Sequence, residues 1–352
     1  MESTKNKNIP NVPPLRFPGF TDEWKETAIG EVVRIVNGKD YKHLENGDIP
    51  VFGTGGYMTS VNDYLYDGET VFIGRKGTID KPFYYSGKFW TVDTLFYTSD
   101  FKNILPKFLL NVFHRINWKL FNEASGVPSL SKATIEKIKI KYPSLPEQEK
   151  ISSLLSLIDE RIVTQNKIID NLRSLIKGLT QTLMFQREPN TRISECLEYH
   201  TSTLQECELN ESGKYPVYGA SGVSGYLEDY KCNQDSILII KDGSGAGTVS
   251  YATGEYSVIG TLNYLTVKPR YSLKYLYFFL KEFNFESFKT GMAIPHIYFK
   301  DYGKAKIYCP PIEEQEQISN GLTIIENKLN IESNLLKSLY MEKQYLLNNM
   351  II

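Results

Sequence analysis

Two cationic side chains at matching places in the chain offer the clearest candidate chemistry. Arg75 lies in GETVFIGRKG (68–77) and Lys241 lies in QDSILIIKDG (234–243), and each of these β-rich runs ends in a glycine. Loops that combine cations with glycine, serine, threonine and tyrosine suit recognition, because cations meet phosphate or guanine and glycine permits close approach. These residues predict binding rather than the making or breaking of bonds.

Motifs that would carry catalysis or hold a metal ion are absent from the sequence. The glycine-rich GSGAG (243–247) lacks the lysine and the hydroxyl residue of a phosphate-binding loop. EWK (23–25) has the local form of a nuclease motif but lacks a suitably spaced aspartate, and NVPP (11–14) has the wrong order for a base-gripping methyltransferase motif. The isolated histidines are His43, His114, His200 and His296. We therefore expect a non-catalytic chain with no metal site.

Composition describes a globular protein with room for two or three domains. The chain has 352 residues, of which 41% are hydrophobic, and a formal net charge of −1, so any basic surface must be local. The polar N-terminus MESTKNKNIPNVPP is no signal peptide, no apolar run reaches the roughly 18 residues of a membrane span, and the four cysteines form no CxxC pair. We expect a cytoplasmic protein with reduced thiols and no membrane contact.

The chain consists of two tandem copies of one unit. IPVFGTGGYMTSVNDY (49–64) and YPVYGASGVSGYLEDY (215–230) share proline, valine, glycine, aspartate and tyrosine at a constant offset of 166. The register continues through the two β-rich runs and reaches LPEQEKI (145–151) and IEEQEQI (312–318) at offset 167. Short apolar runs between glycine-rich turns predict strands in each copy, followed by one or two helices.

A long heptad helix closes each copy. It starts just after proline, with glutamates in the first turn, and its apolar residues step by four and three. At 1.5 Å per residue each helix spans on the order of 55–60 Å. Two such seams should pair antiparallel about a two-fold axis, with the globular parts at opposite ends. The predicted helix-pairing residues are Ile151, Leu155, Ile158, Ile162, Gln165, Ile169 and Leu172 in the first helix, and Ile318, Leu322, Ile325, Leu329, Glu332, Leu336 and Leu339 in the second.

Gln165 and Glu332 are the polar members of the two seams and correspond to each other in the repeat. One interpretation places both near the axis, where a buried polar pair would fix the register of the helices. The other interpretation turns both side chains to solvent. The sequence leaves the two open.

These patterns predict an α+β protein. Two tandem mixed α/β domains are separated by two long antiparallel helices, which form a coiled coil with pseudo-two-fold symmetry. The predicted segments are 1–146 for the first globular domain, 147–185 for the central helix, 186–312 for the second globular domain and 313–352 for the distal helix.

The sequence resembles the specificity subunit of type I restriction–modification enzymes. The residues that carry the resemblance are LRFPGFTDEWKE (15–26), PSLPEQEKISSLLSLIDERI (143–162) and CPPIEEQEQISNGLTIIENKL (309–329). YPVYGASGVSGYLEDY with ILIIKDGSGAGT (237–248) resembles the target-recognition domains of that family. The similarity extends over essentially the full length.

The resemblance implies a division of labour between this chain and its partners. Each globular domain would read one half of an interrupted sequence in double-stranded DNA, and the helices would set the gap between the halves. The helices would also dock two methyltransferase subunits, which bring S-adenosylmethionine and methylate adenine. Restriction–translocase subunits, which use ATP and Mg, would join that core. This chain itself would bind no cofactor.

The residues proposed to contact DNA lie at predicted loops and strand ends. They are Lys39, Tyr41, Thr54, Tyr57, Arg75 and Lys76 in the first domain, and Tyr218, Ser221, Tyr226, Lys241, Asp242 and Ser244 in the second. Arg75 and Lys241 form the best pair because they are equivalent in the repeat. The competing interpretation of both is an exposed charge at the end of a strand.

Two other functions stay open at this point. A coiled-coil scaffold with two duplicated protein- or glycan-binding heads would share the composition and the repeat. A degenerate nuclease would need divalent metal and would cleave DNA without partners. Sequence-dependent binding of DNA in the presence of a methyltransferase partner would separate the first function from both.

Overall fold

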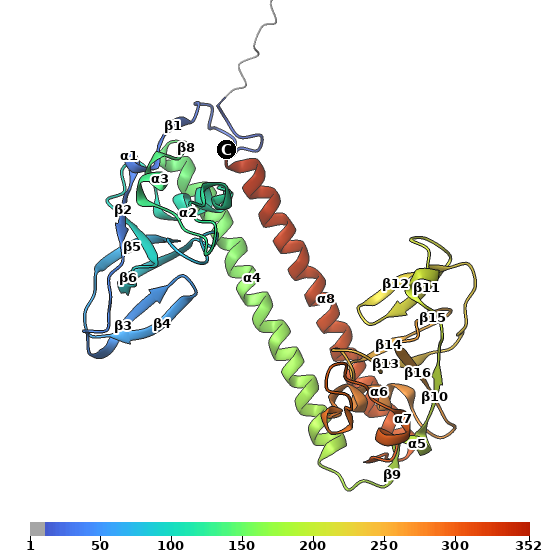
Figure 1. The fold of residues 1–352 in the computed structure, drawn as a ribbon. Coiled ribbons are helices and arrows are strands. Elements are labelled where there is room, and N and C mark those ends of the chain that lie inside the picture. Colours follow the sequence, from blue (N-terminus) through green and yellow to red (C-terminus); the bar gives the residue numbers. More distant parts are fainter. Residues whose placement is uncertain (1–10) are drawn as a thin grey trace, which may run out of the picture. The chain divides into compact units, whose positions relative to one another are not determined.

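The computed structural model describes residues 11–352, which divide into two compact units. Unit 1 contains residues 11–165 together with 335–352, and unit 2 contains residues 166–334. Each unit therefore combines one globular part with portions of both long helices (Figure 1).

The globular part of unit 1 is built on a six-stranded sheet in the order β2-β7-β5-β6-β3-β4. Neighbouring strands are antiparallel except β3 and β6, which are parallel. The strands are β2 (Arg34–Asn37), β3 (Asn46–Gly53), β4 (Gly56–Val61), β5 (Tyr66–Gly74), β6 (Phe83–Thr91) and β7 (Leu95–Ser99). A separate antiparallel pair joins β1 (Lys25–Ala28) to β8 (Lys139–Tyr142).

Short helices cover one face of this sheet. They are α1 (Ile29–Val32), α2 (Pro106–Arg115), a 3₁₀ turn (Trp118–Phe121) and α3 (Lys132–Lys137). Strand β5 is buried on both faces because alternate side chains point to opposite sides. Val71 and Ile73 pack into the core under the helices, whereas Phe72 packs into an aromatic cluster with Phe52 and Phe89 on the other face.

Unit 2 repeats this strand order, but its strands form two separate sheets. Strands β10 (Leu197–Thr201), β16 (Leu262–Val267), β13 (Ser236–Ile240) and β14 (Val249–Ala252) form one sheet in that order. Strands β12 (Gly222–Leu227), β11 (Tyr215–Gly219) and β15 (Ser257–Val258) form a second, and β9 (Thr191–Arg192) pairs with β17 (Lys306–Ile307). The helices are α5 (Ile193–Cys196), α6 (Leu273–Glu282) and α7 (Phe299–Tyr302), with 3₁₀ turns at Glu206–Glu208 and Glu286–Phe288.

The sheets of unit 2 differ from the sheet of unit 1 at one strand. Strand β14 pairs with β13 and β15 runs parallel to β11, whereas the single strand β6 makes both equivalent contacts in unit 1. The correspondence otherwise reaches fine detail. The β3–β4 hairpin has a register shift between Val51 and Phe52, and the β11–β12 hairpin has one between Val217 and Tyr218, at the predicted offset. The prediction of an α+β protein built from two copies of one unit is confirmed.

The long helices are α4 (Leu145–Thr180), which continues into a π-helical turn (Gln181–Phe185), and α8 (Ile312–Met350). In unit 1 the first half of α4 packs against the end of α8, with Ile158 and Ile162 beside Leu339. In unit 2 the end of α4 packs against the start of α8, where Ile176 and Leu322 share a core. The helices therefore run antiparallel in each unit, as predicted.

All fourteen predicted helix-pairing residues are at least half-buried. The fully buried ones are Ile151, Leu155, Ile158, Ile162, Gln165, Ile169, Leu322, Glu332 and Leu339, and the half-buried ones are Leu172, Ile318, Ile325, Leu329 and Leu336. Gln165 and Glu332 are thus both buried rather than turned to solvent. Glu332 forms an ion pair with Lys328 one turn earlier.

Gln148 and Gln315 occupy the same place in LPEQEKI and IEEQEQI, and each joins its globular part to its long helix through hydrogen bonds. In unit 1 the side chain of Gln148 accepts a hydrogen bond from the backbone N–H of Leu105 (2.8 Å), just before α2, and donates to the carbonyls of Asn103 and Pro143 (both 2.9 Å). In unit 2 the side chain of Gln315 accepts from the N–H of Ser272 (2.9 Å), just before α6. This repeated glutamine therefore stabilises the packing of each globular part against its long helix.

No helix within residues 11–352 has the length and apolar character needed to cross a bilayer.

Candidate nucleic-acid interface

Two loops lie against each other in each unit. The strand-end loop follows β5 or β13 and comprises residues 75–77 or 241–243. The proline loop precedes α3 or α7 and comprises residues 126–130 or 291–297. We call each such pair of loops the two-loop platform of its unit.

In unit 1 backbone hydrogen bonds fix the two loops together. The N–H of Gly77 donates to the carbonyl of Pro128 and the N–H of Leu130 donates to the carbonyl of Arg75, both at 2.8 Å. The N–H of Arg75 also donates to the carbonyl of Thr94 (2.8 Å), which joins the strand-end loop to the turn before β7. The loops are therefore held by the sheet.

The same three bonds recur in unit 2. The N–H of Gly243 donates to the carbonyl of Pro295, the N–H of Ile297 donates to the carbonyl of Lys241, and the N–H of Lys241 donates to the carbonyl of Thr261, each at 2.9 Å. The glycines also share one backbone conformation, with φ of +92° at Gly77 and +94° at Gly243, a region that disfavours other residues. The two platforms are copies of one frame.

Both platforms present polar and apolar side chains to solvent. Arg75 and Lys76 are exposed, and one guanidinium nitrogen of Arg75 donates to the carbonyl of Asp93 (3.2 Å), which steadies the group at the loop. Lys241 is partly exposed. Val127 and Ile294, which precede the two prolines at offset 167, have nearly equal exposure of 57% and 58%. Such aliphatic groups suit contact with the thymine methyl group.

The tip of the β3–β4 hairpin borders the platform of unit 1. Thr54 lies at this tip, and its hydroxyl oxygen would be 3.8 Å from a β-carbon placed on Gly77. Tyr57, in the same hairpin, is 63% exposed, and its hydroxyl is 3.0 Å from that of Ser60. In unit 2 the exposed Ser221 occupies the tip of the equivalent β11–β12 hairpin.

The remaining predicted contact residues have other surroundings. Tyr41 packs beside the buried cluster of Val51, Val61 and Trp90, and Tyr218 packs edge-on against Tyr256. These two rings are half-buried, so part of each is used in packing. The other three are the exposed Lys39, whose carbonyl accepts from the Trp90 indole (2.9 Å), the half-buried Tyr226 on β12, and the exposed Ser244 directly after the strand-end loop.

Of the predicted residues, the structure thus gathers Thr54, Arg75 and Lys76 at the platform of unit 1, and Lys241 and Asp242 at that of unit 2. The proline loop is absent from the sequence-based prediction. Its signal was available, because VPSLS (127–131) and IPHIY (294–298) align at offset 167, the same offset as the EQ elements. Glu123 helps to hold this loop in unit 1, where hydrogen bonds from Thr134 and Ser131 lower the pKa of its carboxyl group.

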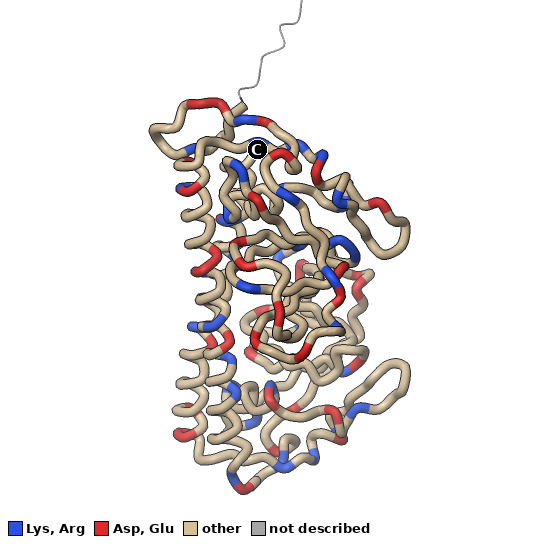
Figure 2. Tube along the Cα trace, turned by 90° about the vertical axis from the view of Figure 1, so that its left-hand side faces the viewer, with Lys and Arg blue, Asp and Glu red and all other residues tan. Residues whose placement is uncertain are grey.

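Charged residues of both signs are interspersed along the chain. Lysine and arginine lie among aspartate and glutamate along the trace in Figure 2, with no long run of one sign.

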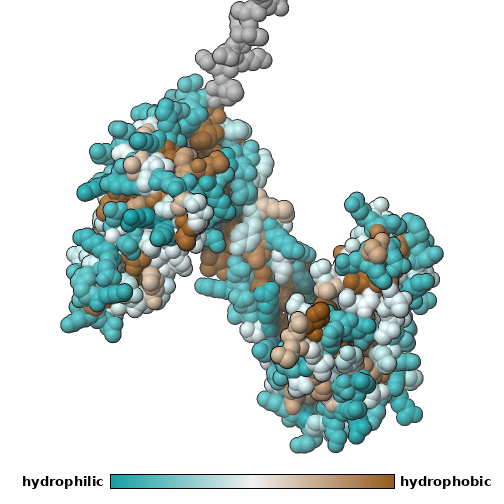
Figure 3. All heavy atoms as spheres, in the orientation of Figure 1, coloured by the Kyte–Doolittle hydropathy of each residue, from teal (hydrophilic) through white to brown (hydrophobic). Residues whose placement is uncertain are grey.

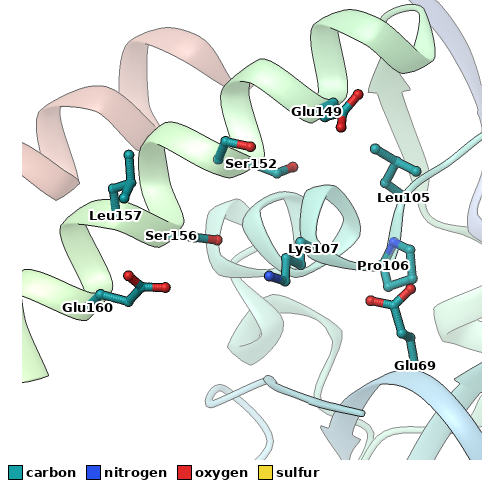
Figure 4. A pocket seen from close by; sticks show the side chains of 10 residues that line it. Glu69, Leu105, Pro106, Lys107, Glu149, Ser152, Ser156, Leu157 and Glu160 are labelled. Carbon is teal, nitrogen blue, oxygen red and sulfur yellow. The ribbon is translucent and has the colours of Figure 1, made fainter.

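A pocket of about 490 Å³ lies in unit 1 between α4, the start of α2 and the edge of β5 (Figure 4). Its polar lining includes Glu69, Lys107, Glu149 and Glu160, together with Ser152, whose buried hydroxyl has no hydrogen-bond partner among residues 11–352. The lining contains no histidine or cysteine. Within residues 11–352 no three or more potential metal ligands gather in one place.

Fold and site together define a class, that of duplicated proteins in which one loop frame occurs twice. Comparisons with known proteins place that class in a family. The model of the type I restriction modification DNA specificity domain matches residues 21–174 and again residues 190–340. The chain therefore belongs to the family of type I restriction–modification specificity subunits and carries two copies of its domain.

Relatives and solved structures agree with this assignment. The chain is 24% identical over 310 residues to a putative type I specificity subunit of Mycoplasma pneumoniae, with 81% of this chain and 83% of that one covered. It is 26% identical over 253 residues to the specificity subunit of a type I restriction enzyme of Methanocaldococcus jannaschii, covering 62% and 56% of the two chains. The crystal structure of a type I S subunit from M. genitalium has a TM-score of 0.75 at 17% identity, over 97% of this chain and 99% of that one.

Specificity subunits are non-catalytic, and catalysis lies in other subunits of the system. The lack of catalytic motifs in the sequence agrees with this role.

Proposed function

We propose that each two-loop platform reads one half of an interrupted sequence in double-stranded DNA. The observation that supports this most directly is the repeated frame with changed side chains. A frame that keeps its backbone hydrogen bonds but differs in its presented groups can bind two different half-sites in the same way, since base edges are distinguished by the donors and acceptors that face them. The exposed cations and the aliphatic residue before each proline fit phosphates, guanine and the thymine methyl group.

The paired helices set the gap between the half-sites and dock two methyltransferase subunits in this proposal. Each helix carries large apolar residues that stay 37–70% exposed within residues 11–352, and a docked partner would cover them. They are Leu157, Val163, Ile168 and Leu175 on α4, and Ile324, Ile331, Leu335, Tyr340, Met341 and Tyr345 on α8. Apolar residues on the long helices are visible in Figure 3.

The partners would supply the chemistry. S-adenosylmethionine would be bound by the methyltransferase subunits, and ATP and Mg by restriction–translocase subunits that join the same core. The chain described here would bind DNA and no cofactor. The similarity to a chain from a type I system studied for its complex assembly (TM-score 0.52, 14% identity) supports an assembled state.

The proposal is tested by mixing the chain with a methyltransferase partner and measuring binding to a pool of random duplex DNA at fixed salt. Sequencing of the bound fraction should give one motif with two defined segments and an undefined gap. A complex that forms but retains all sequences equally would contradict DNA reading, and would favour a scaffold with two protein- or glycan-binding heads.

Replacing Arg75 with alanine is expected to weaken binding to the cognate DNA by about 1–3 kcal/mol, roughly fivefold to 150-fold, if the guanidinium contacts guanine. R75K is the matched control, because lysine keeps the charge but loses the planar pair of donors. R75K should therefore keep the salt dependence of binding and retain only part of the discrimination, because lysine can donate to guanine but lacks the fixed fork of arginine. Unchanged affinity of R75A in a salt-matched assay would remove Arg75 from the interface.

A further inference from the structure

The two platforms differ most at one pair of facing positions. In unit 1 Lys76 forms an antiparallel backbone bridge with Ser129, and in unit 2 Asp242 forms the equivalent bridge with His296. Both positions follow the repeat, at offsets of 166 and 167. The backbone frame is thus unchanged, while a cation in one unit is replaced by a carboxylate in the other.

The carboxylate of Asp242 is held in place. The imidazole Nδ1 of His296 donates to Asp242 Oδ1 at 2.7 Å, and the ammonium group of Lys241 lies 4.0 Å from Oδ2. His296 is itself fixed by two backbone hydrogen bonds with Thr290, of 2.7 and 2.8 Å. About a third of each side chain in the Asp242–His296 pair is exposed. Both oxygens of Asp242 thus have a neighbour that fixes the carboxylate, and each can accept a further hydrogen bond on the part of the side chain that is exposed.

A carboxylate on a DNA-binding loop restricts what it can face. It repels phosphate, and it has no proton to donate to the acceptor atoms of guanine. The groups of the major groove that it can bind are the exocyclic amino groups, for which aspartate accepting from cytosine N4 is the favoured pairing. Lysine at the equivalent place has the opposite preference, because its donors match guanine O6 and N7.

We propose that Asp242, positioned by His296, determines specificity in the second half-site by accepting a hydrogen bond from a base amino group, that of cytosine, and that Lys76 selects guanine at the corresponding place in the first half-site. This inference rests on the proposed function and names the base chemistry of each platform.

The test maps methylated adenines in cells that carry the whole system with variant chains. D242A should lose the requirement for cytosine at one position of one half-site, with discrimination there falling about fivefold to 150-fold. D242K should convert that position to guanine. The other half-site should not change in either variant, which provides an internal control for folding and assembly.

His296 is a positioning residue in this scheme. H296A should relax the same base position as D242A, and H296N, which can again donate to the carboxylate, should restore part of the discrimination. A merely structural role for the histidine would instead lower methylation at all sites equally.

Different results would contradict the proposed function and the role of Asp242. If the unaltered chain yields no motif with two segments, the proposed function is wrong. If it yields such a motif and D242A and D242K yield the same one, only the role of Asp242 is wrong. A required adenine rather than cytosine at the affected position would overturn the choice of base.

Discussion

Replacing Arg16 with methionine is expected to lower the free energy of unfolding of unit 1 by about 3–5 kcal/mol, because it leaves a buried carboxylate without its partner. The guanidinium of Arg16 donates two parallel hydrogen bonds to Glu147, at 2.6 and 2.7 Å. The Glu147 side chain is only 1% exposed. This pair ties the N-terminal segment to the first turn of α4.

Tryptophan fluorescence during denaturant unfolding measures the effect in unit 1 alone. The chain has three tryptophans, Trp24, Trp90 and Trp118, and all three belong to unit 1. In the double variant R16M/E147L most of the loss should be recovered, because a buried ion pair replaced by apolar groups is often close to neutral. A midpoint for R16M that equals that of the unaltered chain would show that the pair does not hold the unit together.

Replacing Gln148 with leucine should lower the free energy of unfolding of unit 1 by about 3 kcal/mol or more. The change leaves three backbone groups without a hydrogen-bond partner, and each buried unsatisfied group costs roughly 1–3 kcal/mol. Gln148 is fully buried, so water cannot take its place. The equivalent Gln315 contacts two backbone groups, the N–H of Ser272 and the carbonyl of Pro310. Q315L should therefore lower the free energy of unfolding by less, and the loss should be confined to unit 2.

The two glutamine variants control for each other. Q148L should shift the tryptophan transition, whereas Q315L should leave it in place and increase amide hydrogen exchange in α6. Equal shifts of the tryptophan transition in both variants would mean that each glutamine does not stabilise its own unit separately.

The heptad pattern predicted the helices well because burial on a long helix follows from spacing alone. Residues such as Ile158 and Ile162 are buried by their place in the seam, beside Leu339 of α8. The repeat likewise predicted the topology of unit 2 from that of unit 1, since equal sequences of turns and apolar runs pair in equal ways. The split of one strand into β14 and β15 was not predicted, because Thr253-Gly254-Glu255 at the break resembles Ser86-Gly87-Lys88, which β6 accommodates without breaking.

The candidate site was predicted only in part, since it depends on contacts between distant segments. Arg75 and Lys241 were found because a cation beside a glycine at a strand end is visible locally. The proline loop lies about 50 residues later in each unit and joins the site through backbone hydrogen bonds. The repeat of VPSLS and IPHIY marks the loop in the sequence but does not say which segment it packs against. Tyr41 and Tyr218 show a second limit of the sequence. A tyrosine in a turn-rich stretch can stack outward or pack inward, and the local pattern does not distinguish the two.

The central claim, that two separate readers act on one DNA target, is tested most directly by exchanging one of them. Residues 186–312 are replaced by the corresponding segment of another family member of known target, and methylated adenines are mapped in cells that carry the complete system. The account predicts a hybrid motif in which one half is new and the other half is that of the original chain. A motif that changes in both halves would contradict it.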